Sequence, residues 1–307
     1  MANSSDEILQ RLRHDACLVL DGALKAVDPK EAVLNALSLD GDILSYEGGS
    51  VDLSKTKKIV VVGGGKAGGL MTKAVEALLG KRITSGYVNV LKGTEDSVKT
   101  GRVILRGASH PIPDHEGMKG VDKMFDLTNG LTKRDLVITL MSGGGSALMP
   151  YPASGMTLED MRELTGILLK AGVTINELNS VRKHISGFKG GQFARHVYPA
   201  RMINLLLSDV IGDPIDIIAS GPTSPDESSF MEARSVVVKY GLLDEIPENV
   251  LTRLNAGTNG MVPETPKPGD PIFENVSNLV IANNYMAAKA ASDVAEELGY
   301  NSLLLST

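Results

Sequence analysis

The sequence predicts an α/β fold: a Rossmann-like, mostly parallel sheet flanked by helices, followed by the start of a second, smaller α/β domain. From Lys58 onward, short runs rich in β-branched residues alternate with segments of helical periodicity, which is typical of right-handed βαβ units. Two of the apolar runs end in glycine-rich turns. In a parallel sheet such turns emerge together at the carboxyl edge, where α/β proteins bind their ligands.

Composition and charge narrow the class of protein. The 307 residues are 42% hydrophobic and 22% charged, which is typical of a globular chain with one large domain or two smaller ones. The net charge of -6 argues against a nucleic-acid partner. Cys17 is the single cysteine, so no disulfide framework forms within the chain. No run approaches the roughly 18 apolar residues of a membrane span, and no signal peptide is evident, so we expect a cytoplasmic protein without membrane partners. The sequence is compatible with a homo-oligomer.

The expected elements follow in order. Two amphipathic helices come first, over residues 5–26 and 29–37, the second capped by Asp28 and begun by Pro29. Further helices are expected from the first glycine turn to Gly80, over 116–131, and over 158–194 with breaks at glycines. The expected strands cover residues 59–62, 87–91, 102–106, 135–141 and 202–210.

The domain division expected from the sequence has three parts. Residues 1–255 form the Rossmann-like domain, and the proline- and glycine-rich residues 256–275 form a linker. Residues 276–307 then supply a strand at 278–282, a helix at 284–298 and a strand at 303–306. One βαβ unit is too small for a stable sheet. Either it joins the main sheet or it opens a second domain, and we divide the chain on the second interpretation.

The first glycine turn, in KIVVVGGGKAGG at residues 58–69, contains Gly64, Gly65 and Lys66. The spacing Gly-x-Gly-x-x-Gly between a strand and a helix predicts backbone amides that receive phosphate. An NAD site would need an acidic residue after the next strand, where Lys92 stands instead. The P-loop pattern is absent, because no serine or threonine follows Lys66. The alternative is a tight turn without a ligand.

A second turn, Ser142-Gly143-Gly144-Gly145-Ser146, follows the strand at 135–141. Its serines and amides are suited to a carboxylate or phosphate, although a flexible turn would have the same glycines. His110 follows the strand at 102–106, in SHPIPD, at the same edge. His110 is suited to orient a substrate or move a proton. We weigh this role equally against the alternative that the histidine only bonds to backbone groups of its own loop.

Two further segments carry candidate charges. Helical spacing places Asn179, Arg182, Lys183 and Ser186 near one face, with Lys189 on the glycine turn beyond. This arrangement predicts a cationic wall facing bound anions, unless it is simply a solvated face. Asp209 ends the buried strand at 202–210, where a carboxylate can accept a hydroxyl proton or bind magnesium.

The motifs VVGGGKAGG, SHPIPD, LMSGGGSALMPYP, NELNSVRKHISGFKGGQ and LLLSDVIGDPIDIIASGPTSPD together resemble the glycerate 2-kinase family, whose C-terminal part is the MOFRL domain. They run in family order over residues 58–226. The resemblance implies transfer of phosphate from ATP, with Mg²⁺, to the 2-hydroxyl of D-glycerate. It also implies that Lys66 contacts phosphate and that Asp209 is the base or a metal-associated carboxylate. The second glycine turn and residues 182–191 would line the cleft.

Family members continue for roughly another hundred residues beyond Thr307, so the resemblance implies that most of the second wall of the cleft lies outside this chain. We therefore expect the 307 residues alone to bind weakly or to be inactive. Two alternatives stay open: an NADP-dependent reductase of a hydroxypyruvate-like acid, with Lys92 on the 2′-phosphate, and a binding module without catalysis.

Overall fold

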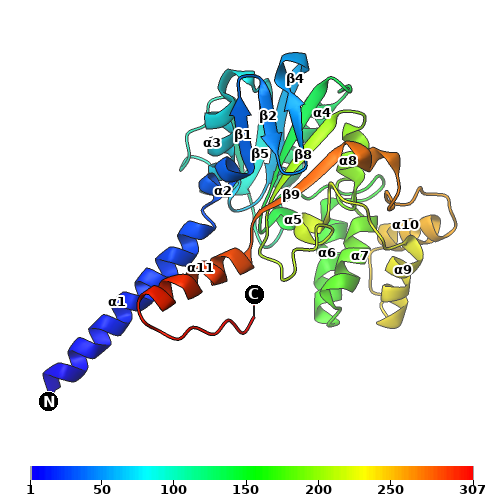
Figure 1. The fold of residues 1–307 in the computed structure, drawn as a ribbon. Helices are drawn as coiled ribbons and strands as arrows, with labels where there is room; N and C mark the ends of the chain where they lie inside the picture. Colours follow the sequence, from blue (N-terminus) through cyan, green and yellow to red (C-terminus); the bar gives the residue numbers. More distant parts are fainter. Residues whose placement is uncertain (1, 307) are drawn as a thin grey trace.

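A six-stranded parallel sheet forms the centre of the molecule. The computed structural model describes residues 2–306, and its ribbon is drawn in Figure 1. The strand order is β6-β5-β4-β7-β8-β9, which is the order 3-2-1-4-5-6 of a doubly wound dinucleotide-binding fold. The strands are β4 (Lys58–Gly64), β5 (Ser85–Leu91), β6 (Val103–Ala108), β7 (Asp135–Met141), β8 (Arg201–Leu207) and β9 (Val276–Ala282). The predicted α/β class, a mostly parallel sheet flanked by helices, is confirmed.

The register of the central strands brings their carboxyl ends level. Gly64 of β4 lies opposite Met141 of β7, and Met141 lies opposite Leu206 of β8. The residues that follow these three strands therefore emerge side by side. Strand order reverses between β4 and β7, and this is where ligands bind in open α/β sheets.

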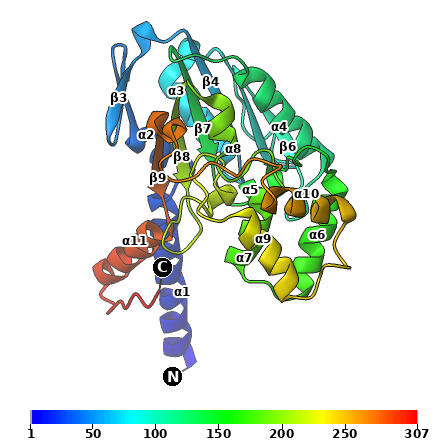
Figure 2. The ribbon, with the colours of Figure 1, turned by 90° about the vertical axis from the view of Figure 1, so that its right-hand side faces the viewer.

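Helices cover both faces of the sheet, and Figure 2 shows the two layers from the side. On one face, α2 (Pro29–Ala36) and α3 (Gly68–Leu79) pack over an apolar core with β4, β5 and β7. On the other face, α4 (His115–Thr128) and α8 (Gln192–Val197) cover a second core that includes Phe188 and Phe193. Asp28 caps α2 by accepting from the N–H groups of Lys30 and Glu31, as the sequence predicts.

A separate group of helices lies below the carboxyl edge in Figure 1. It consists of α6 (Leu158–Lys170), α7 (Ile175–His184), α9 (Phe230–Lys239) and α10 (Glu248–Thr258), which share a third apolar core. Capping boxes begin three of these helices, at Thr157, Thr174 and Ser229. The predicted helical region over 158–194 is thus divided at its glycines into α6, α7 and α8, and α9 and α10 have no counterpart in the sequence prediction.

The ends of the chain differ from expectation in three places. Residues 37–52 form a small antiparallel sheet, β1 (Leu37–Asp40), β2 (Ile43–Tyr46) and β3 (Gly49–Asp52), which the sequence analysis did not predict. Strand β9 pairs with β8 and so joins the main sheet, the first of the two alternatives. The strand expected at 303–306 is wrong, because these residues have no regular structure.

Helices α1 (Ala2–Ala26) and α11 (Asn284–Glu297) pack against each other and extend away from the sheet (Figure 1). Where they cross, a Cβ on Gly22 would lie 2.7 Å from Cγ2 of Val294. Glycine therefore lets the two backbones approach closely at this point.

Candidate functional site

Five of the predicted site residues come together at the level carboxyl edge of the sheet. Lys66 follows β4, His110 follows β6, and Gly143 and Gly144 follow β7. Asp209 follows β8, two residues after the strand ends at Leu207. This edge therefore combines a cation, an imidazole, a carboxylate and a glycine turn.

The glycines of the second turn allow these side chains to approach the backbone. A Cβ on Gly143 would lie 2.3 Å from Oδ2 of Asp209, which is closer than atoms can pack. A Cβ on Gly144 would lie 3.1 Å from Cδ2 of His110 and 3.4 Å from Cε of Lys66. Gly144 also has a φ of 84°, which favours glycine. Asp209 thus lies close to Gly143, and His110 and Lys66 lie close to Gly144.

The amides of the first glycine turn are already bonded within the protein. The N–H of Gly65 donates to the carbonyl of Asn89 at 3.1 Å, and the N–H of Lys66 donates to the carbonyl of Gly143 at 2.9 Å. The N–H of Ala67 donates to Oγ of Ser142 at 3.1 Å. These bonds contradict the expectation that the backbone at Gly65 receives phosphate.

The close approach of the two turns explains the glycine spacing of the first. Gly63 has a φ of 146°, and a Cβ there would lie 2.1 Å from the carbonyl oxygen of Leu140. Gly65 has a φ of 152°, and a Cβ there would lie 2.0 Å from Oγ of Ser142. Gly64 is buried as well. Because these glycines have no side chains, the first turn can pack closely against the second.

The second turn keeps its amides available. Among residues 2–306, no protein acceptor bonds the N–H groups of Gly143, Gly144 and Ser146. They precede or begin the short helix α5 (Gly145–Leu148), at the positions where helical amides have no partner within the helix. Backbone donors in such a turn form a concave site for an anion. Anion binding was expected at both turns, and the second turn has the free amides that it requires.

The charges around this turn act on one another. Burial lowers the pKa of His110, Lys66 lowers it further, and Asp209 opposes them. His110 is therefore a neutral imidazole at pH 7 and can accept as well as donate a hydrogen bond. Lys66 and Asp209 are both exposed. The carboxylate of Asp209 has no hydrogen-bond partner within the described part of the chain, which leaves it open to a ligand.

A partly buried hydroxyl relay connects the second turn to α7. Oγ of Ser146 lies 2.8 Å from Oγ of Ser220, which donates to Oδ1 of Asn179 at 3.2 Å. Ser220 has a φ of 60°, and Ala219 before it has a φ of 52°, values that L-residues rarely adopt. Backbone of this kind is concentrated at functional sites.

Ser220 was not singled out by the sequence analysis, although the segment that contains it forms part of the family resemblance. A serine before Gly221 and Pro222 reads as an ordinary turn. The distance of 74 residues between it and Ser146 hides the contact from any local pattern.

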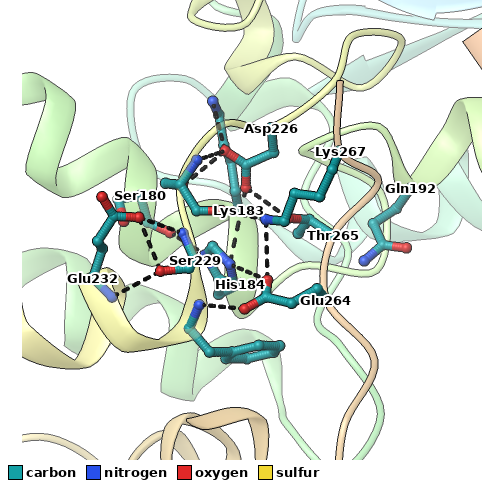
Figure 3. Close-up of polar contacts among 12 residues, drawn as sticks. Ser180, Lys183, His184, Gln192, Asp226, Ser229, Glu232, Glu264, Thr265 and Lys267 are labelled. Carbon is teal, nitrogen blue, oxygen red and sulfur yellow. Dashed lines mark hydrogen bonds and ion pairs between the residues drawn. The ribbon is translucent and has the colours of Figure 1, made fainter. Parts of the chain in front are cut away.

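The expected cationic wall on α7 is only partly present. Lys183 is 5% exposed, and its Nζ donates to Oδ2 of Asp216 at 3.0 Å and to Oδ1 of Asp226 at 3.3 Å. Figure 3 shows this amine directed at Asp226, within a network that includes His184 and Thr265. Lys183 is therefore neutralised by carboxylates and is not free to face a bound anion, which corrects its predicted role.

The network around Lys183 extends into the segment expected as a linker. Oε2 of Glu264 lies 3.1 Å from Nε2 of His184 and 3.1 Å from Nζ of Lys267, and Oγ1 of Thr265 donates to Oδ2 of Asp226 at 2.9 Å. Both ring nitrogens of His184 face acceptors, since Nδ1 lies 2.7 Å from the carbonyl of Ser180. The segment is thus fixed to α7 by charged and polar contacts (Figure 3).

Arg182 and Lys189 differ from Lys183 in having no carboxylate partner within 4.0 Å among the described residues. Lys189 is 2% exposed, and its Nζ donates to the carbonyl of Met149 at 2.9 Å. Burial, together with the nearby Arg182, lowers its pKa to about 7. Arg182 is half-buried, and burial lowers its pKa. Of the predicted cations, Arg182 and Lys66 are available to a ligand.

Asp209 suits one kind of magnesium site. Within residues 2–306 no three acidic, histidine or cysteine side chains are grouped so that they could hold a metal ion. Magnesium bound with a nucleotide commonly takes one or two carboxylates and completes its shell with phosphate and water. A single exposed carboxylate beside free amides fits that mode.

Among the described residues, no helix has the length and apolar character needed to cross a membrane.

Comparison with known proteins places this edge in a family context. A family model described as "Domain of unknown function (DUF4147)" matches residues 15–255. The chain is 35% identical over 300 residues to a glycerate 2-kinase of Pyrococcus horikoshii, covering 98% of this chain and 66% of that protein. A crystal structure of a glycerate kinase from Thermotoga maritima aligns with a TM-score of 0.77 at 34% identity, covering 96% of this chain and 65% of that one.

A further relative, from Agrobacterium vitis, is 38% identical over 287 residues and has a provisional hydroxypyruvate reductase name. The alignment covers 94% of this chain and 60% of that protein. The chain thus spans 60% to 66% of the length of these three relatives.

Proposed function

The chain belongs to the DUF4147 family and is similar to glycerate kinases, and on that basis we propose that it carries the phosphate-transfer edge of a glycerate 2-kinase. The reaction would move the γ-phosphoryl group of ATP to the 2-hydroxyl of D-glycerate. The observation that carries the proposal is the meeting of Lys66, Asp209 and the free amides of the second glycine turn at one level edge. Phosphoryl transfer depends on positioning and charge compensation, and these groups supply both.

We assign the phosphate site to the second turn. The N–H groups of Gly143, Gly144 and Ser146 would bond phosphate oxygens. Lys66 would place its ammonium beside Gly144, since its Cε lies 3.4 Å from the Cβ position of that glycine. The buried Lys189 holds the carbonyl of Met149 instead. Between the two lysines, Lys66 is therefore the one that we assign to the transferred phosphate.

Asp209 is proposed to accept the proton of the attacking 2-hydroxyl. Its Oδ2 is near the Cβ position of Gly143, so it faces the turn that would bind the phosphate. A positioned base contributes about 10² to 10⁴ in rate. Asp209 would also be the protein ligand of Mg²⁺, which when bound compensates phosphate charge. His110, as a neutral imidazole, would hydrogen-bond the substrate without adding charge.

Arg182 is proposed to bind an anionic group of the substrate. Its guanidinium has no carboxylate partner among the described residues, and a guanidinium matches a carboxylate with two parallel hydrogen bonds. Asn179 would act less directly, because its Oδ1 accepts from Ser220 in the relay to Ser146. In this assignment, the relay sets the position of the Ser146 hydroxyl.

The alternative reaction is hydride transfer from NADPH to a hydroxypyruvate-like acid. The strand order and the relative from Agrobacterium vitis support it. The first glycine turn argues against it, because the amides that would receive the pyrophosphate of a dinucleotide already bond Asn89, Gly143 and Ser142.

Phosphorus NMR of the purified chain with ATP, Mg²⁺ and D-glycerate tests the proposal. Because the chain spans 60% to 66% of the length of these relatives, we expect 2-phosphoglycerate to form far more slowly than at an ordinary kinase rate, and we expect Lys66→Met to reduce its formation further. Lys73→Met on the exposed face of α3 is the matched control and should leave the rate unchanged. Hydroxypyruvate with NADPH is assayed in parallel by absorbance.

Ligand binding provides a readout that does not depend on turnover. ATP with Mg²⁺ should raise the melting temperature of the chain, and Lys66→Met should reduce that rise. NADPH oxidation, or a melting temperature that neither ATP nor glycerate changes, would contradict the assignment.

A further inference from the structure

The amino edge of the sheet, opposite the glycine turns, contains a cavity of about 610 Å³. The amino ends of β7 and β8 line one side of it, and the segment after β3 lines the other. Its lining residues include Lys55, Lys133, Arg134, Asp135 and Arg201. Cavities of 300 to 1,000 Å³ are the usual size of small-molecule sites. The reaction edge does not contribute to this cavity, so it would be a separate site.

The cavity is lined by four cations and two carboxylates, those of Asp52 and Asp135, and so it is basic in a protein whose net charge is -6. Of its four cations, Lys55 alone pairs with a carboxylate, that of Asp52 at 2.8 Å. Lys133, Arg134 and Arg201 have no carboxylate within 4.0 Å among residues 2–306. Like charges around one hollow repel one another, and their field attracts anions into it.

A buried carboxylate forms part of the wall of the cavity. Asp135 is 5% exposed, and its Oδ2 accepts from N and Oγ1 of Thr132 at 2.8 and 2.7 Å. Its other oxygen, Oδ1, has no hydrogen-bond partner in the described structure and is closed to solvent. A ligand in the cavity therefore does not reach Oδ1, and the charge of Asp135 offsets one of the three unpaired cations.

We propose that this cavity binds a small molecule with two or more phosphate groups. After the charge of Asp135 is subtracted, the three unpaired cations leave about two positive charges, which exceed what a single carboxylate would neutralise, whereas a diphosphate matches them. The wall of the cavity is fixed to the sheet, because the N–H of Lys57 donates to the carbonyl of Arg134 at 2.8 Å. The proposal is independent of the reaction at the carboxyl edge.

Titration calorimetry with inorganic pyrophosphate tests this site. The titrations use the Lys66→Met chain, in which the cation of the other edge is absent. We expect saturable binding at 50 mM salt, and we expect it to weaken as salt rises, because exposed charges are screened. The double change Lys133→Gln with Arg134→Gln should weaken the affinity about tenfold or more.

A matched control removes two positive charges elsewhere. Lys81 and Lys170 are exposed and have no carboxylate partner among the described residues, so changing both to Gln alters the net charge equally. This control should bind pyrophosphate within about twofold of the parent chain. No saturable binding at 50 mM salt, or equal weakening in both double variants, would overturn the site.

Discussion

Replacing Lys183 with methionine should damage folding rather than ligand binding. The Lys183 amine is 5% exposed and bonds Asp226, whose carboxylate is fully buried. Removing one partner of a buried ion pair costs about 3 to 5 kcal/mol, because the other charge stays buried. Asp226 would keep the N–H and Oγ of Ser228 and Oγ1 of Thr265. The lower end, about 3 kcal/mol, is therefore expected, or a fall in Tm of about 6 °C at this chain length.

An exposed ion pair provides the matched control for this change. Nζ of Lys239 lies 2.6 Å from Oε1 of Glu177, and its side chain is 62% exposed. Pairs of this kind contribute about 0 to 1 kcal/mol, so Lys239→Met should shift Tm by no more than about 2 °C. Both variants are unfolded thermally and with urea under the same conditions. A loss for Lys183→Met no greater than that for Lys239→Met would refute the assignment of a buried, neutralising pair.

The pH dependence of the same pair gives a second test. Burial by itself would raise the pKa of Asp226, but Lys183, Ser228 and His184 together hold it below the usual value. This lowered pKa contributes stability above the unfolded pKa, and the contribution is lost as pH falls through the folded pKa. Without Lys183, burial dominates, so the carboxyl can take up a proton at higher pH and become neutral. The difference in stability between the two proteins should therefore shrink from pH 7 toward pH 4, and a constant difference would contradict the mechanism.

Three other changes address the reaction edge and the buried lysine. Asp209→Asn should lower kcat about 100-fold or more while Tm stays unchanged, since the side chain is exposed; steady-state rates and melting curves check both. Ser220→Ala removes the bonds to Ser146 and Asn179 and should raise KM for glycerate about tenfold, with an unchanged circular dichroism spectrum. Burial and Arg182 lower the pKa of Lys189 to about 7 from 10.5, so the unfolded chain binds more protons between these values. Stability should then rise with pH in this range, and Lys189→Met should flatten the rise in melting temperatures measured from pH 7 to 9.

The central sheet could be predicted from sequence because its central strands, β4, β7 and β8, are buried on both faces. All seven residues of β7 are buried, so the strand reads as a continuous apolar run. The glycine turns after β4 and β7 could be placed at one edge because parallel strands end at the same edge of a sheet. The small sheet at 37–52 was harder to predict, because its strands are four residues long and mix buried with exposed positions.

The partners of the candidate side chains could not be predicted. Helical spacing correctly places Asn179, Arg182 and Lys183 on α7, but it does not distinguish a free cation from a paired one. The carboxylates that neutralise Lys183 lie 33 and 43 residues further along the chain, at Asp216 and Asp226. Arg182, one residue away, has no such partner. The difference between a structural and an available cation therefore depends on tertiary contacts.

The first glycine turn shows why a motif is not by itself a binding site. Its sequence satisfies the spacing of a phosphate-binding fingerprint, and it stands between a parallel strand and a helix as that fingerprint requires. Its glycines nevertheless serve the contact with the neighbouring turn, because a Cβ on Gly65 would meet Oγ of Ser142 at 2.0 Å. The same contact uses the amides of Lys66 and Ala67 and holds Gly143 in place. The first turn therefore contributes Lys66 and a rigid support, and the neighbouring turn presents the amides to the anion.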